Sequence, residues 1–315
     1  MRLILILFAV ILFLIPFIVP EGYLYIVGLS FLFAIAVASW DLMVGYTGKV
    51  NLGHTVFIGI GGYTAAVLQR ALNPPVYLTI PIGGLVASVL GFLIGLITLR
   101  LRGYYFALVT AILPLVFMQT VFIWSDIFGG EEGFSIGVEN ALSQTTVGKY
   151  YITTILMLAS ISVMIYIVDS KLGVKFKAIR EDEDLAESLG IDTTKYKIIA
   201  FVISSFFAGI TGSAIVHYRI TVGPDLYDVP LMLLIILSAV IGGLGTIYGP
   251  VLCGVLIYLS KNWWLKEIIE LAGLPVNDEI ILYSILILVG IFLPGGIFEA
   301  LKRSTTKLKN ILGKR

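Results

Sequence analysis

The sequence predicts an all-α polytopic membrane protein with about ten transmembrane helices, and three observations support this prediction. Apolar residues make up 58% of the 315 residues and charged residues only 13%, whereas a soluble domain carries about a quarter charged residues. Apolar runs of membrane-spanning length follow one another along the chain, and the connections between them alternate in charge. No long polar segment could fold separately, so residues 1–315 are expected to form a single transmembrane domain.

Ten apolar runs approach the roughly 20 residues that a helix needs to cross a bilayer. They are residues 3–19, 23–44, 54–72, 76–99, 104–125, 150–168, 198–218, 230–241, 247–265 and 280–293. The eighth run is short and the third is rich in glycine. We interpret the first run as a span rather than a signal peptide, because Pro-Glu-Gly follows it without a small-x-small cleavage motif.

The charges of the connections predict the orientation. Arg2, the pair Arg100 and Arg102, the connection 169–197 and the tail 294–315 are basic, while the connections 126–149 and 266–279 are acidic. Basic connections face the cytoplasm. Ten spans place every basic segment and both termini in the cytoplasm, with 126–149 as an extracytoplasmic loop, whereas nine or eleven spans would place the basic tail outside. The tail is expected to lie beside anionic lipid.

Composition also excludes several functions. A net charge of +1 provides no field that would attract nucleic acid. The single cysteine, Cys253, excludes a disulfide within the chain and a cysteine-ligated metal site. Residues 45–50 superficially resemble a phosphate-binding loop, but Met43 stands where glycine is required and Val50 where Ser or Thr would hold magnesium. We therefore expect no catalytic residue, no metal, no directly bound cofactor and no ATP hydrolysis by this chain alone.

The connection 169–197 is the longest cytoplasmic one, and two short helices are expected in it. Asp184 is expected to cap the second helix, with Glu187 three positions later and Gly190 ending it in a left-handed turn. The apolar side chains of the pair are Phe176, Ile179, Leu185, Ala186 and Leu189. They could form a surface that docks on a partner, or they could pack against their own bundle.

Six segments together resemble one family. They are Gly45-Tyr-Thr-Gly-Lys-Val-Asn-Leu-Gly-His54, residues 99–107, Gly129-Gly-Glu-Glu-Gly-Phe134, residues 173–192, residues 196–212, and Ile241-Gly-Gly-Leu-Gly-Thr-Ile-Tyr-Gly-Pro250. In this order they resemble branched-chain amino acid permeases of ATP-binding-cassette (ABC) importers, and the M-type subunit in particular. The resemblance covers about residues 40–260, and Asp41 departs from the uncharged pattern expected there.

The resemblance implies a type II ABC importer permease-like bundle in the plasma membrane. It implies a heterodimer with a second homologous permease, two ABC ATPase subunits that bind ATP and Mg, and an extracytoplasmic substrate-binding protein. It implies branched-chain amino acids as cargo, with urea, amides and other amino acids left open. The residues that would then couple to the ATPase are Phe176, Ile179, Arg180, Glu181, Asp182, Leu185, Ala186, Glu187, Leu189 and Gly190.

The expected translocation path has two parts. Its candidate residues are Gly45, Gly48, Asn51, Gly53 and His54 in the glycine-rich junction, and Tyr104, Tyr105, Thr110 and Gln119 on the fifth span. Tight helix packing at the junction and interhelical hydrogen bonds on the span are the alternatives. In the related fold the fifth span lines the channel between two permeases.

Three other polar features have simpler interpretations. Asp41 is expected to pair with Arg100 or Arg102, and His54 to satisfy backbone groups, so both are given structural roles. The acidic turn at 129–133 is either a solvated loop or a surface near the binding protein. An ion-coupled secondary transporter is the alternative function, but the sequence lacks the mid-membrane carboxylates that such coupling uses. A membrane enzyme would need clustered acids or histidines in one span.

Overall fold

The computed structural model describes residues 12–101, 104–265, 267, 271, 280–284 and 287–288. The helices are α2 (Glu21–Thr47), α3 (Thr55–Leu72), α4 (Val76–Thr98), α5 (Tyr105–Ile123), α6 (Ser125–Phe128), α7 (Thr146–Asp169), α8 (Lys171–Glu181), α9 (Glu183–Ser188), α10 (Thr193–Arg219), α11 (Val229–Gly242) and α12 (Tyr248–Leu259). The 3-10 turns η1 (Val138–Asn140) and η2 (Pro224–Tyr227), the π-helical segment η3 (Ser260–Trp264) and strands β1 (Phe134–Ser135) and β2 (Thr221–Val222) complete the described elements.

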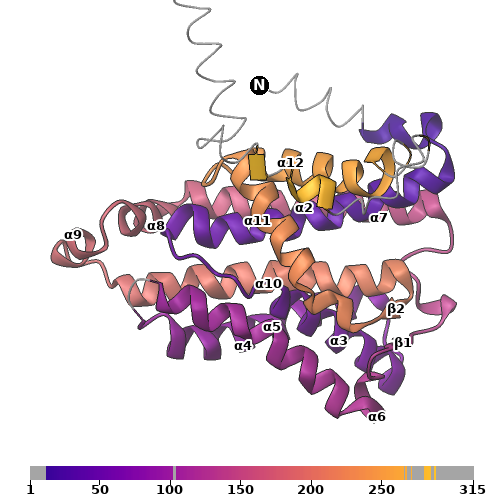
Figure 1. Cartoon of the computed structure of the whole chain (residues 1–315), viewed down its shortest axis with the longest axis horizontal. Helices are drawn as coiled ribbons and strands as arrows, with labels where there is room; N and C mark the ends of the chain where they lie inside the picture. The colour runs from indigo at the N-terminus through magenta and orange to yellow at the C-terminus, as the bar shows by residue number, and fades with distance from the viewer. Residues whose placement is uncertain are drawn as a thin grey trace, which may run out of the picture.

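The helices form two layers (Figure 1). In one layer α2 contacts α7, α11 and α12, and in the other α10 contacts α3 and α4. The two layers meet where α2 packs on α10. The short helix α9 stands at one end of the bundle, and α6 with β1 and β2 lies at the other end.

Five helices are long and apolar enough to cross a membrane, namely α2, α4, α5, α7 and α10. They coincide with five of the predicted spans. The glycine-rich α3 and the short α11 and α12 occupy three more. Helix α11 has 14 residues and is therefore about 21 Å long, less than the roughly 30 Å of a hydrocarbon core. The first and tenth predicted spans extend beyond the described residues.

Burial differs sharply among these helices. Almost all of the apolar stretch of α2 is buried within the bundle, whereas only 22% of that in α5 is buried. The exposed side chains of α5 include Leu108, Ile112 and Leu115. An outer surface of this kind is stable against lipid or another apolar protein surface, because neither competes for hydrogen bonds.

Glycines allow α3, α4 and α10 to approach closely. A Cβ on Gly212 would lie 1.8 Å from the Ile58 carbonyl oxygen, and one on Gly61 would lie 2.1 Å from the Gly209 carbonyl oxygen. Contacts this short leave room only for hydrogen at these positions. The close approach of α3 and α10 therefore depends on glycine at Gly61 and Gly212.

The cap predicted for the second cytoplasmic helix was wrong by two residues. Helix α9 begins after Asp182, whose carboxylate accepts a hydrogen bond from the Leu185 amide at 2.9 Å. The reason is that α8 ends at Glu181 and the backbone turns extended at Asp182, so Asp184 already lies in the first helical turn. The end of the helix is as predicted: Gly190 has φ +83° and the Ile191 amide donates to the Ala186 carbonyl at 3.0 Å.

The connection 126–149 is fixed to the end of α10 by a short antiparallel ladder, in which Phe134 pairs with Val222. Gly133 has φ +66°, and a Cβ on it would lie 2.0 Å from the Val222 carbonyl oxygen. Glu131 and Glu132, by contrast, are exposed. The acidic turn is thus a defined, outward-facing structure rather than a loose loop.

Candidate functional site

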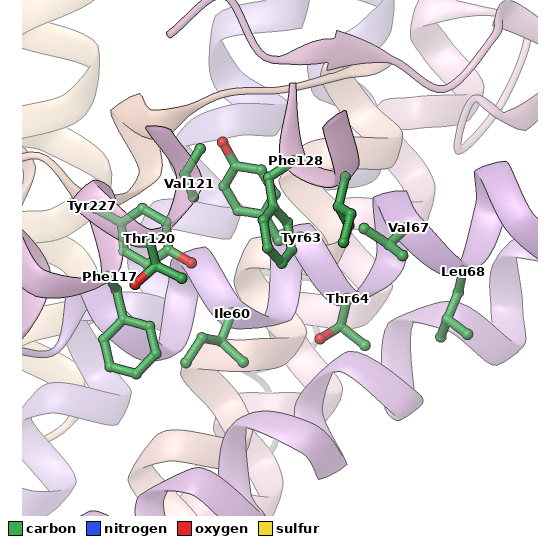
Figure 2. Close-up of a pocket in the computed structure, with 11 residues that line it drawn as sticks. Ile60, Tyr63, Thr64, Val67, Leu68, Phe117, Thr120, Val121, Phe128 and Tyr227 are labelled. Carbon is green, nitrogen blue, oxygen red and sulfur yellow. The ribbon is translucent and has the colours of Figure 1, made fainter. Parts of the chain in front are cut away.

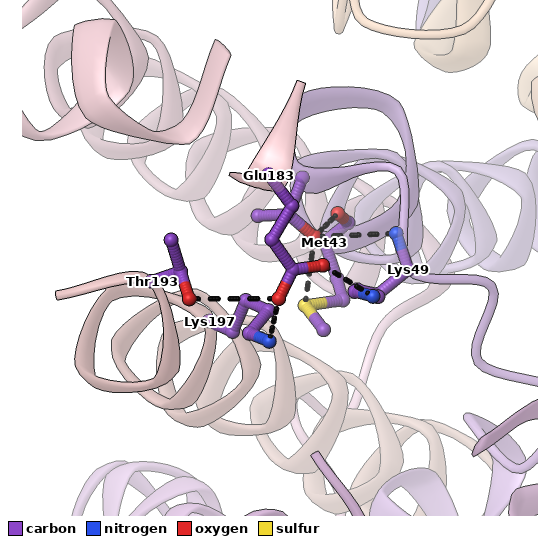
Figure 3. Close-up of polar contacts among 6 residues, drawn as sticks. Met43, Lys49, Glu183, Thr193 and Lys197 are labelled. Atoms are coloured by element: carbon purple, nitrogen blue, oxygen red, sulfur yellow. Dashed lines mark hydrogen bonds and ion pairs between the residues drawn. The ribbon is translucent and has the colours of Figure 1, made fainter. Parts of the chain in front are cut away.

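A three-way polar contact attaches α9 to the bundle (Figure 3). The Glu183 carboxylate pairs with Lys49 at 2.7 Å and with Lys197, and it accepts a longer hydrogen bond from Thr193 at 3.5 Å. Lys49 lies in the junction between α2 and α3, while Lys197 and Thr193 lie in the first turns of α10. One side chain therefore joins α9 to both layers of the bundle.

The electrostatics of Glu183 favour its charged form. Burial opposes ionisation, but the hydrogen bonds and charges of Lys197 and Lys49 outweigh it and hold the pKa of Glu183 below its ordinary value. The carboxylate is therefore ionised at neutral pH. The Lys197 side chain is only 5% exposed, so removal of Glu183 would leave a buried ammonium group without its counter-charge.

Helix α8 contacts the end of α2 directly. The Arg180 guanidinium donates a hydrogen bond to the Gly45 carbonyl, and the Lys177 ammonium lies 5.4 Å from the centre of the Tyr46 ring. Gly48 has φ +73°, and a Cβ on it would lie 3.5 Å from Cγ of Arg180. Helix α8 is thus connected to the glycine-rich junction through a backbone carbonyl as well as through an aromatic ring.

Asp41 fixes a second junction. Its carboxylate accepts hydrogen bonds from the amides of Gly245 at 2.7 Å and Ile247 at 3.0 Å, between α11 and α12. The predicted pairing with Arg100 was wrong, because Asp41 is fully buried and faces this junction while Arg100 is exposed beyond the end of α4. Arg102 lies outside the described residues.

The predicted coupling residues separate into two groups. Phe176, Ile179 and Ala186 are buried, so these three side chains pack against their own bundle, which is one of the two arrangements that the sequence left open for them. A helix as short as α9 needs tertiary contacts to be stable, and Ala186 is its one buried residue. Leu185 on α9 and Leu189, which caps the C-terminal end of α9, are 57% and 74% exposed. Also exposed are Arg180, Glu181, Asp182, Glu187 and Gly190.

The predicted path residues also separate. The Asn51 side chain accepts from the Gly53 amide at 2.9 Å, and the Thr110 hydroxyl accepts from the Leu52 amide at 3.1 Å. A Cβ on Gly53 would lie 2.2 Å from the Thr110 carbonyl oxygen. The junction therefore packs against α5, in the way that the packing alternative describes.

The remaining path candidates lie apart from this contact. The His54 ring lies 2.9 Å from the Ser39 hydroxyl inside the bundle, so this contact is with a side chain and not with the backbone groups that the sequence led us to expect. Tyr104, Tyr105 and Gln119 face outward on α5. No contact among the described residues brings these three side chains to the junction.

A cavity of about 420 Å³ lies between α3, α5, α6 and η2 (Figure 2). Its wall includes Tyr63 and Tyr227, whose rings stack at 5.8 Å, and Phe117 from α5. Sequence reasoning missed this cavity. The only signal was the helical spacing of Ile60, Thr64 and Val67 on α3, which is equally typical of a packed face. Among the residues that the structure places, no group of three His, Cys, Asp or Glu could hold a metal ion.

The fold and the apolar outer helices define a multi-pass α-helical membrane protein. The chain belongs to the family described as branched-chain amino acid transport system / permease component, which matches residues 22–290. It is 27% identical to the high-affinity branched-chain amino acid transport permease LivM of Salmonella typhimurium, over 94% of this chain and 74% of the relative.

Two further relatives extend the comparison. LivM of Escherichia coli K12 has the same identity and coverage. The probable branched-chain amino acid permease LivH of Methanocaldococcus jannaschii is 24% identical, over 69% of this chain and 71% of the relative. No solved structure matched the chain.

Proposed function

We propose that this protein is one permease subunit of an ABC importer in the plasma membrane, and that it translocates branched-chain or related amino acids. Membership of the permease family supports the transport role. Relatives named both LivM and LivH suggest that a second, homologous permease completes a heterodimer. A substrate-binding protein would deliver the cargo, and two separate ATPase subunits would bind ATP and Mg, so that this chain binds neither cofactor.

The observation that carries this proposal is the attachment of α9. Glu183 and Arg180 connect the α8–α9 pair to the junctions of α2, α3 and α10, while Leu185 and Leu189 remain exposed on the outer side. The α8–α9 pair has an apolar outer face and a polar attachment to the bundle. A partner that binds the outer face and moves it would therefore move the attached helices as well. We propose that the outer face docks on the ATPase.

The proposed topology follows the same polarity. With α9 in the cytoplasm, β1, β2 and α6 at the opposite end of the bundle lie outside. Ten spans and cytoplasmic termini remain the arrangement that agrees with the charges of the connections. The exposed pair Glu131 and Glu132 would then face the binding protein.

The decisive experiment reconstitutes the chain with its partner subunits in liposomes and measures uptake of leucine, valine, alanine, urea and acetamide. We expect uptake of the branched-chain amino acids that requires both internal ATP and the binding protein and that an uncoupler leaves unchanged. Uptake that collapses with the uncoupler and ignores ATP would instead establish an ion-coupled transporter. The purified single chain should hydrolyse no ATP, and measurable hydrolysis would contradict the proposed division of labour.

A further inference from the structure

A second cavity, of about 320 Å³, lies at the end of the bundle away from α9. Residues of α2, α10, η2, α11, α12 and η3 line it. Four charged side chains contribute to its wall: Arg219, Asp225, Asp228 and Lys261. Its volume falls at the lower end of the range for small-molecule pockets, so it suits a ligand of about amino-acid size.

The charges of this cavity balance, with two cations and two anions. Arg219 pairs with Asp225 at 2.7 Å, and their side chains are 34% and 53% exposed. Both side chains are therefore accessible to a ligand, and the ion pair between them already holds each one in place. Asp228 follows η2 and Lys261 lies in η3, so the four charges come from three separate segments. A cavity that combines positive and negative side chains is complementary to a ligand that carries both a positive and a negative charge.

Apolar side chains form the deeper part of the wall. Ile215 lies one helical turn into α10 from Arg219, and Leu234 lies more than one turn into α11. Phe33 extends the same surface from the middle of α2 and packs against Tyr258 at 5.2 Å between ring centres. The cavity is therefore charged where the helices end, and it is lined by aliphatic and aromatic side chains deeper in the bundle.

We propose that this cavity binds a free amino acid with an apolar side chain. Arg219 and Lys261 recognise its carboxylate, Asp225 and Asp228 recognise its ammonium group, and the side chain contacts Ile215 and Leu231, which are partly exposed. The inference rests on the proposed function and deepens it, because it assigns the cargo class to a site on the permease itself. On the proposed topology the cavity lies at the outer end, where cargo enters.

The same chemistry argues against the other cargo classes. Urea and amides carry no charge, so they would desolvate the ion pair without replacing its interactions, and this is costly for a partly buried charge. The cavity between α3 and α5 is lined by no charged residue and could not match a zwitterion. The cavity between α3 and α5 is thus apolar, whereas the second cavity carries two positive and two negative side chains.

Equilibrium binding tests the proposal. The permease complex, in nanodiscs without binding protein or nucleotide, is titrated with radiolabelled leucine. Competitors are unlabelled leucine, leucinamide, which lacks the carboxylate, and 4-methylpentanoate, which lacks the ammonium group. We expect saturable binding that leucine displaces and that each truncated analogue displaces at least about tenfold more weakly, because each loses charge-assisted hydrogen bonds.

Variants locate the site. Arg219→Gln and Asp225→Asn should each weaken leucine binding at least about tenfold, and Leu231→Phe, which narrows the cavity, should weaken it without removing a charge. Arg70→Gln and Asp126→Asn change exposed residues outside the cavity and should leave binding unchanged. Gel filtration would reveal whether the variants that lose the ion pair fail to fold. In that case Leu231→Phe, which keeps the ion pair, still tests the site.

The outcomes separate this inference from the proposed function. If the same complex takes up leucine with ATP and binding protein but binds none in the titration, the proposed function stands and the site is wrong. The site is equally wrong if leucinamide competes as well as leucine, or if no cavity variant weakens binding. Absence of leucine uptake by the wild-type complex would overturn the proposed function instead.

Discussion

At the scale of single residues, Glu183 carries the attachment of α9. One of its two lysine partners lies in the junction between α2 and α3 and the other in α10, so its loss affects the attachment to both. Glu183→Gln should lower the stability of this attachment by about 1–2 kcal/mol, since charge-assisted hydrogen bonds are replaced by neutral ones at a partly exposed site. Hydrogen exchange of the α9 amides should then accelerate about tenfold, and ATP-dependent uptake should fall.

The matched control is Asp184→Asn, which removes one negative charge from an exposed position on the same helix. It should leave both exchange and uptake near wild type. Equal effects of the two substitutions would show that net charge on α9, rather than the contact with Lys49 and Lys197, is what matters.

The same residue predicts a pH dependence. Because the folded protein holds the pKa of Glu183 below its ordinary value, the contact contributes its full stability above that ordinary value of about 4.3 and loses it as the pH falls through the folded value. Exchange of the α9 amides, corrected for intrinsic rates, should therefore be constant from pH 8 to 6 and rise in acid. In Glu183→Gln the acid rise should be absent, and its persistence would assign the effect to another group.

At the scale of elements, α9 presents an apolar outer face. Leu185→Ala combined with Leu189→Ala should reduce co-purification of the ATPase subunit at least about tenfold, since each buried leucine contributes about 1.5–3 kcal/mol. Leu72→Ala, at an equally exposed leucine near the other end of the bundle, is the control and should co-purify normally. Full retention by the double variant would place the docking surface elsewhere.

The close approach of α3 and α10 predicts a second effect at this scale. Gly212→Ala forces a Cβ into the Ile58 carbonyl and should destabilise the bundle by about 2 kcal/mol or more. Gly22→Ala meets no atom within 4 Å and should not. Thermal unfolding of the detergent-solubilised chain compares them, and similar midpoints for the two variants would contradict the packing described.

Sequence reasoning located the eight helices within residues 21–265 that correspond to predicted spans, because the length of an apolar run reports directly on a span. It could not decide that Phe176 is buried and Leu189 exposed, since both fit an amphipathic helix and only the tertiary contact distinguishes them. The partners of Asp41 could not be predicted either, because they are backbone amides, which every residue type except proline carries. The four charged residues of the second cavity come from three segments that no single motif connects.

At the scale of the whole molecule, the two ends of the bundle should lie on opposite sides of the membrane. In a Cys253→Ala background, Ser188→Cys on α9 and Glu131→Cys in the acidic turn are both at exposed positions. In right-side-out vesicles an impermeant maleimide should label Glu131→Cys alone, and after permeabilisation it should label both. Labelling of both before permeabilisation would contradict the proposed orientation.

The hydrogen bonds of Asp41 also mean that its environment is completed only late in the synthesis of the chain. The carboxylate and the Gly245 amide are 204 residues apart in the chain, which at about 5–20 residues per second is roughly 10–40 s of translation. During that interval an acidic group has left the ribosome on a helix that will end fully enclosed, and its partners do not yet exist. Helix α2 must therefore wait for the last third of the chain before its environment is complete. A nascent chain arrested before Gly245 would present this carboxylate to the insertion and quality-control machinery.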